Sequence, residues 1–406
     1  KKLNTMKFMG LLVLLGHFTS PMLLPLVCCR MIELTFDFGF CEESISGLLF
    51  ASHTLLHYSS ENELARKISR ISESLMNGNR NAHSLRAKLT PFFSVKSLVE
   101  PLQMMADSGY NSAEILGDVD AAMTCGLIHC AVSFHSISDL TGLQKYMVIL
   151  FHQMAKHKRV GALHSVMSYF DSVGTLIGNG KSCSIDGRID GHKEGKTNKE
   201  LYQIAEQIES TYLMHHVITN QMCVHCYFRE YSLVADLFEK NRKMRTGMNN
   251  TGAKRNLDFS HVFFEGISAL CLARNTKQEK WRQIGENSIK TMTKLVEYSD
   301  WNFENKLKLL QAELHYLYDC HSMAELFYQA SITSAREHKF LHEKAMAHEL
   351  YGIYLVENKM VAEGLEQLHQ ATENYEKWGA QKKADEVNDF IVLINLTVDL
   401  WKQKTN

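Results

Sequence analysis

The sequence predicts an all-α protein built from stacked antiparallel helix pairs, and three observations support this fold class. Small and bulky residues near the C-terminal end recur at a period of about 40 residues, as in helix-pair repeats. The chain of 406 residues contains only four prolines, and none follows Pro101, which favours long uninterrupted helices. No stretch alternates apolar and polar residues more clearly than it repeats them at helical spacing, so we expect no strands.

The repeat is clearest in two copies that lie 40 residues apart. The second copy has small, large, small, large and small residues at Gly352, Leu355, Gly364, Leu368 and Ala371. The same offsets in the first copy hold Ala312, His315, Ala324, Tyr328 and Ser331. Small residues let two antiparallel helices approach closely, and bulky residues fill the groove between them.

This spacing is typical of a tetratricopeptide (TPR) hairpin, which cannot bury its apolar face alone. We therefore expect TPR-like hairpins over about 306–377, as part of an antiparallel helix-pair superhelix, an α-solenoid. The structural repeat positions on which this prediction depends are Ala312, Ala324, Tyr328, Gly352, Leu355, Gly364, Leu368, Ala371, Trp378 and Gly379.

Composition indicates a folded protein without a global attraction to nucleic acid. The chain is 45% hydrophobic and 22% charged, with a formal net charge of −1. A nearly neutral chain has no long-range attraction to nucleic acid or to an anionic membrane. Most of the ten cysteines stand in apolar helical runs, where a free thiol acts as a small apolar side chain. We therefore expect a reducing, cytoplasmic location.

The N-terminal stretch 8–29 leaves two interpretations open. It has no charged residue and follows three lysines, which is typical of a signal peptide or a membrane span. On that interpretation the chain is membrane-associated, as an anchored sensor. Polar residues and prolines interrupt the stretch, so we favour two buried helices over 3–17 and 21–38, with Ser20 as N-cap and Pro21 at the first helical position.

The rest of the N-terminal half, residues 1–178, has the pattern of further helices. Apolar spacing predicts a pair over 43–58 and 61–76, then helices over about 95–116 and 119–136 joined by a Gly117-Asp118 turn. Two more helices are expected near 138–158 and 160–177.

A glycine-rich polar tract over 179–197 separates this half from the C-terminal helical half, residues 198–406. Five glycines lie among Lys, Ser and Asp between 178 and 197, so we expect an exposed loop there. Helices resume over about 198–245, a second polar break covers 245–256, and helices then continue from 258 to 404.

One motif near the tract resembles a phosphate-binding loop. Residues 175–182 differ at one position from the Walker A pattern, because Thr175 stands where the first glycine is needed. Such a loop cradles phosphates between a strand and a helix N-terminus, whereas here a helix is expected before it. Nucleotide binding is therefore the weaker alternative to a flexible loop.

Two other groups of residues have a structural and a functional interpretation. Cys223-Val-His-Cys226 with His215 and His216 could suggest zinc, but these residues lie in a run that is typical of one continuous packed helix. A basic cluster flanks the second polar break without interleaved aromatics, which favours a solvated loop over nucleic-acid contact: Arg242, Lys243, Arg245, Lys254 and Arg255. No kinase loop or serine-hydrolase elbow is present in the sequence. We expect no enzyme, cofactor or metal site.

The C-terminal block resembles the TPR-like helical region of large multi-sensor signalling kinases. The resemblance is carried first by Trp301-Asn302-Phe303, Lys306, Leu309, Glu313, Ala324, Phe327, Tyr328, Ala330, Ile332 and Ala335. It continues through Phe340, Glu343, Ala345, Ala347, Glu349 and the closing Tyr375-x-x-Trp378-Gly379-Ala380. The family joins a serine/threonine kinase-like domain, a STAND/AAA-type ATPase, a helical array and a GAF sensor. The resemblance extends less strongly to the N-terminal half, through Leu23–Met31 and Gly117-Asp118.

The resemblance implies a non-catalytic, regulatory scaffold segment of a multidomain signal-transduction kinase or ATPase. Any kinase or ATPase activity would reside in domains outside this sequence. The chain opens on Lys1-Lys2 rather than Met, and we expect it to be a piece of a larger polypeptide. Its concave groove is expected to hold a protein partner, either a peptide or another domain of the same polypeptide, and no nucleic acid.

Overall fold

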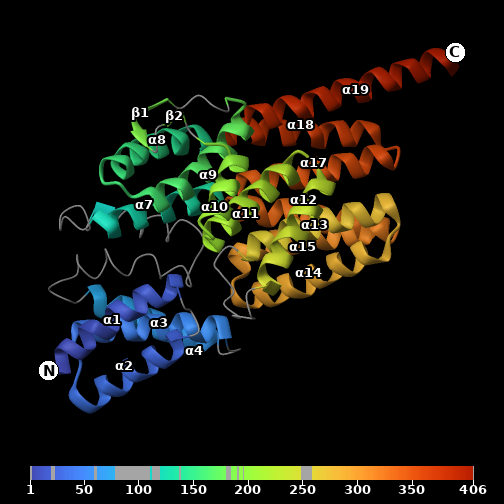
Figure 1. Ribbon diagram of the computed structural model, residues 1–406. Coiled ribbons are helices and arrows are strands. Elements are labelled where there is room, and N and C mark those ends of the chain that lie inside the picture. The colour runs from blue at the N-terminus through green and yellow to red at the C-terminus, as the bar shows by residue number, and fades with distance from the viewer. Residues whose placement is uncertain are drawn as a thin grey trace. The chain divides into compact units, whose positions relative to one another are not determined.

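The computed structural model describes residues 2–19, 23–58, 62–77, 110–111, 119–136, 139–179, 184–189, 192–194, 196–247 and 258–405. Helices dominate the described residues, which confirms the predicted all-α class (Figure 1). The chain forms two compact units, and each is described by itself. The N-terminal unit comprises Lys1–Val132 with Met244–Asp258, and the C-terminal unit comprises Ser133–Lys243 with Phe259–Asn406. These units differ from the expected halves, because residues 133–178 belong to the C-terminal unit.

The N-terminal unit contains α1 (Lys2–Thr19), α2 (Leu24–Phe38), α3 (Glu42–Tyr58), α4 (Asn62–Asn77) and most of α7 (Val119–Phe134). Helix α3 packs against α2 and α4. The bounds of α3 and α4 lie close to those expected from apolar spacing. The core of this unit is formed by Met6, Val13, Leu24, Cys28, Met31, Ile45, Leu49, Phe50 and Met76. Most of the helix predicted over 95–116, and the Gly117-Asp118 turn, lie outside the described residues.

Helix α2 corresponds to the helix predicted over 21–38. Helix α2 begins at Leu24 after the N-cap residue Leu23, and Pro25 lies in its first turn. Proline is tolerated at that position because the first N–H groups of a helix have no partner inside the helix. The expected cap at Ser20 and Pro21 lies outside the described residues. In the described part of the chain, none of the helices has the length together with the apolar character that a bilayer span requires.

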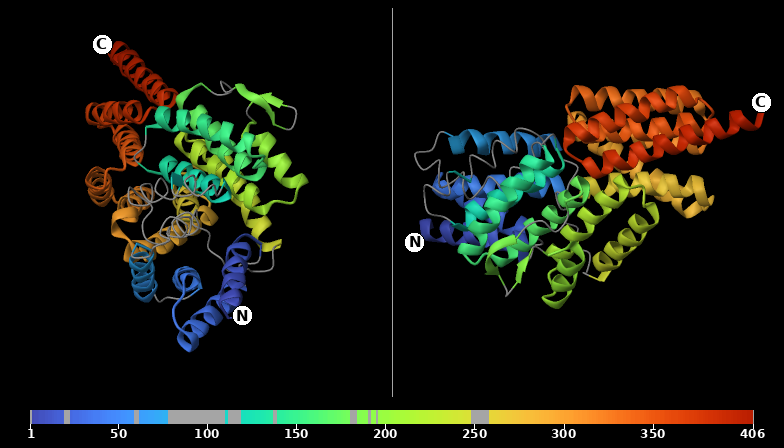
Figure 2. Two further views of the ribbon diagram at one scale, coloured as in Figure 1. Left: turned by 90° about the vertical axis from the view of Figure 1, so that its left-hand side faces the viewer. Right: turned by 90° about the horizontal axis from the view of Figure 1, so that it is seen from above.

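The C-terminal unit is a succession of antiparallel helices. Most helices pack against the next one in the chain, and Figure 2 shows them side by side. Their bounds are α8 (Leu140–Lys156), α9 (Val160–Ile177), α10 (Asn198–Gln207), α11 (Thr211–Tyr227), α12 (Tyr231–Gly247), α13 (Asp258–Thr276), α14 (Glu279–Tyr298), α15 (Asp300–Leu317), α16 (His321–Glu337), α17 (Leu341–Glu357), α18 (Val361–Trp378) and α19 (Gln381–Thr405).

A short β-hairpin interrupts this succession, which corrects the expectation that the chain has no strands. Strands β1 (Ser184–Ile189) and β2 (His192–Glu194) pair antiparallel, with Ile189 opposite His192. The sequence signal is short, because Ile185 and Ile189 alternate around a glycine over only six residues. Asp190-Gly191, a dipeptide favoured in two-residue hairpin turns, stands between the strands in the sequence and was not recognised as a signal.

The ends of the helices from α15 to α18 recur at a fixed interval. Asp319, Lys339, Lys359 and Gly379 follow one another every 20 residues, and all have positive φ. The residue after each donates its N–H to a carbonyl five residues earlier, as in the 2.9 Å bond from Cys320 to His315. This bond is the six-to-one bond of a Schellman cap, which reverses the chain at the end of a helix. A turn every 20 residues gives the helix pairs their 40-residue period.

Candidate functional site

The α17–α18 hairpin is closed by a very near approach of two glycines. A Cβ added to Gly364 would lie 2.6 Å from Val356 Cγ2 and 2.9 Å from the Gly352 carbonyl oxygen. A Cβ on Gly352 would lie 2.8 Å from Leu368 Cγ. Because real Cβ contacts are longer than this, only glycine fits both positions without a shift of the neighbouring helix.

The other expected repeat positions also lie at contacts between helices or at a helix end. Gly379 has a φ of 87° and ends α18 as its C-cap. A Cβ on this glycine would lie 2.9 Å from Asp139 Oδ1, so the end of α18 meets the start of α8. The remaining positions are buried: Ala312, Ala324, Tyr328, Leu355, Leu368, Ala371 and Trp378.

Helix α17 is buried on nearly every side. Twelve of its 17 residues are buried, whereas only five of the 17 residues of α16 are. One side of α17 is covered by α18, and another meets the turn between α11 and α12. Tyr227 at the end of α11 packs its ring 6.1 Å from Tyr375 and 5.3 Å from Trp378. Both of these rings belong to α18, so the end of α11 and the turn after it lie against α17 and α18.

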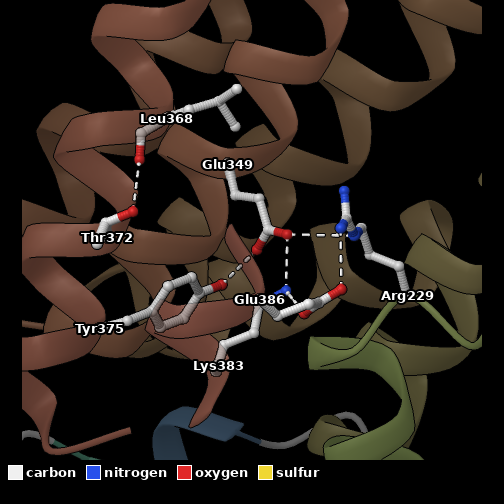
Figure 3. A network of polar contacts seen from close by, with 7 residues as sticks. All are labelled: Arg229, Glu349, Leu368, Thr372, Tyr375, Lys383 and Glu386. Atoms are coloured by element: carbon white, nitrogen blue, oxygen red, sulfur yellow. Dashed lines mark hydrogen bonds and ion pairs between the residues drawn. The ribbon is translucent and has the colours of Figure 1, made fainter. Parts of the chain in front are cut away.

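Five side chains join this turn to α17, α18 and α19, and we call them the polar junction (Figure 3). Arg229 Nε lies 3.3 Å from Glu349 Oε1, and its Nη2 donates to Glu386 at 2.9 Å. Lys383 donates to both carboxylates, each at 2.7 Å. Tyr375 donates to Glu349 at 2.8 Å. The junction thus matches two cations with two carboxylates across three helices and one turn.

Burial makes this matching necessary. The Lys383 side chain is 0% exposed and that of Glu349 is 3% exposed, so neither charge has water to solvate it. Burial alone would lower the pKa of Arg229, but the carboxylates of Glu349 and Glu386 outweigh it and raise that pKa. Burial, together with Glu349, raises the pKa of Tyr375 well above its usual value, so the phenol stays protonated. Its O–H can then donate the hydrogen bond to Glu349. Arg229 therefore stays charged and Tyr375 stays neutral, which suits a structural contact.

Two further buried carboxylates of the array are matched in the same way. Glu343 of α17 lies 2.7 Å from the Lys306 ammonium of α15. Burial would raise the pKa of Glu343, but Lys306 and His342 hold it at about 2. Glu313 of α15 lies 2.6 Å from Arg274 of α13. Buried ionic contacts therefore recur between alternate helices, from α13 to α15 and from α15 to α17.

The phosphate-loop motif has the wrong structural context. Thr175 lies within helix α9 and donates its hydroxyl to the Asp171 carbonyl at 2.8 Å. Gly178 is the left-handed C-cap of the same helix. Strand β1 is the next described element, so a helix precedes a strand here, the reverse of the order around a phosphate loop. Lys181 and Ser182 lie outside the described residues.

The residues considered for zinc all lie on helix α11, which is continuous from Thr211 to Tyr227. His216 Nδ1 lies 3.1 Å from the Tyr169 hydroxyl, and burial raises the pKa of Cys226 to about 12. Burial also raises the pKa of Cys223 well above its usual value, which disfavours the thiolate that zinc requires. Among the described residues, no group of three or more His, Cys, Asp or Glu is placed to hold a metal.

The polar junction is not predicted from the sequence. The pairing of Arg229 with Glu349 joins residues 120 positions apart, and no local pattern predicts such a contact. One signal was available: Glu349 stands inside the apolar run of α17, where a carboxylate needs a buried partner. Glu313, Glu343 and Glu349 are among the residues that carry the resemblance, but without an assigned role.

The fold and the polar junction define a helix-pair repeat protein of the all-α class. A scan against models of known protein families finds no match. A search of curated proteins likewise finds no significant relative.

Proposed function

We propose that this chain is a non-catalytic helical-repeat scaffold, the regulatory segment of a multidomain signal-transduction kinase or ATPase. In this role it mediates protein–protein or interdomain contacts in the cytoplasm. The observation that carries the proposal is the polar junction. There α17 and α19 hold the turn between α11 and α12, which comes from a distant part of the same chain. Helix-pair arrays commonly act by holding helices or peptides against the surfaces of their repeats.

The chemistry of the junction supports holding rather than turnover. Catalytic acids and bases need pKa values near the working pH, so that a proton can leave and return. The pKa of Arg229 is raised and that of Tyr375 lies well above its usual value, so both stay protonated. Another surface of the helical array that binds a separate domain would work in the same way, because matched charges determine which partner binds.

The resemblance to multi-sensor signalling kinases supports the regulatory context, and the chain's genomic neighbourhood tests it. The proposal expects a STAND/AAA-type ATPase frame on one side of the segment and a GAF frame on the other. The purified ATPase and GAF domains encoded there should bind the full chain in isothermal titration. Flanking sequence that encodes neither domain, or encoded domains that do not bind, would contradict the proposal.

The nucleotide-binding alternative has its own test. Isothermal titration of the full chain with ATP and magnesium should give no binding heat on our proposal. Saturable binding that is lost in Lys181→Ala would instead assign a nucleotide site to residues 175–182.

A further inference from the structure

Four buried side chains of the C-terminal unit each carry a polar atom that has no hydrogen-bond partner among the described residues. These atoms are Trp378 Nε1, Tyr227 Oη, His342 Nδ1 and Asn305 Oδ1, and we call them the unpaired atoms. The four side chains are only 1–4% exposed, so bulk solvent does not reach them. Buried polar atoms in folded proteins almost always have a partner, so these exceptions need an explanation.

The ring of Trp378 is a shared neighbour of two of the other side chains. Its centroid lies 5.3 Å from that of the Tyr227 ring and 5.1 Å from that of the His342 ring. Tyr227 ends α11, His342 lies in the first turn of α17, and Trp378 ends α18. The packing of these helices therefore gathers three of the unpaired atoms in one part of the unit.

The carboxylate of Glu343 is a second shared neighbour and adds the fourth atom. Asn305 donates its amide N–H to this carboxylate, and His342 Nε2 lies 3.6 Å from Glu343 Oε1. Burial, Cys223 and Glu343 together raise the pKa of Tyr227 well above its usual value, so the tyrosine hydroxyl lies within electrostatic reach of the same carboxylate. The four unpaired atoms thus surround one buried acid and one buried indole.

The unpaired atoms match the hydrogen-bonding capacity of water. The indole N–H of Trp378 can only donate, whereas the amide oxygen of Asn305 can only accept. The Tyr227 hydroxyl can do either, and so can His342 Nδ1, depending on its tautomer. A water molecule both donates and accepts hydrogen bonds and commonly makes two to four of them, so it can serve both kinds of atom.

An ion is less suited to this place than a neutral molecule. The Glu343 carboxylate is already matched by the Lys306 ammonium at 2.7 Å, so no unmatched charge is left for an ion to neutralise. A cation would be repelled by the indole N–H of Trp378. An anion would be repelled by Glu343 and by the amide oxygen of Asn305.

We propose that ordered water is bound inside the C-terminal unit, with at least one molecule bridging two or more of the unpaired atoms. Folded proteins hold about one buried water per 27 residues, typically bonded to polar groups that lack a protein partner. Such a water joins the ends of α11 and α18 to the start of α17 without a charged contact. This inference is independent of the signalling role proposed above.

Urea unfolding of Tyr227→Phe tests the proposal by the sign of its effect. Loss of a water-bonded hydroxyl should lower the equilibrium constant for folding about fivefold, the effect of one ordinary hydrogen bond. Loss of a dry hydroxyl should instead raise it, because burying an unbonded hydroxyl is unfavourable. The matched control is Tyr375→Phe, whose hydroxyl has a protein acceptor in Glu349 at 2.8 Å and whose loss should lower the constant. A Tyr227→Phe chain at least as stable as the natural chain would overturn the proposal.

A crystal structure of the full chain, at a resolution that shows ordered solvent, identifies the bound molecule. The proposal expects a solvent peak about 2.7–3.2 Å from at least two of the unpaired atoms. Atoms that all bond to protein groups instead, or that have no solvent peak beside them, would overturn it.

Discussion

Two of the contacts that helix α17 makes differ in character. Toward α18 the two backbones approach each other at Gly352 and Gly364, an uncharged contact, and Tyr375 of α18 also donates to Glu349. Toward the α11–α12 turn it is closed by the polar junction, in which buried Glu349 meets Arg229 and Lys383. The glycine contact joins neighbours in the chain by fit alone, whereas the charged contact joins distant segments. A steric fit makes the hairpin, and a charge match specifies which segment lies beside it.

Removing one side of the charged contact should have the largest effect. In Glu349→Ala the buried ammonium of Lys383 and the guanidinium of Arg229 lose a shared carboxylate. Breaking a buried ion pair costs about 3–5 kcal/mol, because the remaining charge stays desolvated. Urea unfolding followed by circular dichroism should show this loss of unfolding free energy.

A double variant sharpens the same test. Glu349→Leu with Lys383→Met removes both charges and should recover much of the lost stability, since an apolar pair of similar volume replaces a buried ion pair at small net cost. A double variant as unstable as Glu349→Ala would indicate that packing, and not unmatched charge, explains the loss.

The glycine contact should respond to a single methyl group. Gly364→Ala should destabilise the chain, because the new Cβ would lie 2.6 Å from Val356 Cγ2. Gly364→Leu should cost about 1–3 kcal/mol or more through overpacking. The same urea titration measures both variants.

Gly161→Ala is the matched control for the glycine contact. Gly161 lies in α9 with nothing within 4 Å of its added Cβ. There alanine should stabilise by up to about 1 kcal/mol through helix propensity. Equal stabilisation by Gly161→Ala and Gly364→Ala would refute the close approach of α17 and α18.

Acid should weaken the charged contacts before it affects the glycine contact. Glu343, with a pKa of about 2 in the folded chain, has a depressed value relative to its ordinary pKa of 4.5. Its contribution to stability is therefore complete above about pH 4.5 and is lost as pH falls toward about 2. Urea midpoints measured across this range should fall less steeply in Glu343→Gln than in the natural chain. An unchanged pH profile in that variant would contradict the Glu343–Lys306 pair.

An exposed ion pair should have the smallest effect. Lys377 lies 2.5 Å from Glu373 on the surface of α18, and both side chains are at least half exposed. Solvent screens such a pair, so its net contribution is slight. Lys377→Ala should leave the urea midpoint unchanged within error. A clear shift would show that an exposed ion pair stabilises the chain as the buried pairs do.

The comparison also explains what could be predicted from the sequence. The hairpin contact depends on small residues at fixed offsets, so Gly352 and Gly364 could be chosen from spacing alone. The polar junction depends on how a distant turn is placed, and Arg229 has no neighbour in the sequence that indicates its partners. The β-hairpin was not predicted because its alternation covers only a few residues.

A double-mutant cycle between Arg229 and Glu349 tests the central claim most directly, namely that matched buried charges hold the α11–α12 turn beside α17. The four chains are the natural sequence, Arg229→Met, Glu349→Gln and the double variant, compared by urea unfolding. Coupled residues give interaction energies of about 0.5–3 kcal/mol, and the upper part of this range is predicted here. Effects that add within about 0.3 kcal/mol would contradict the claim.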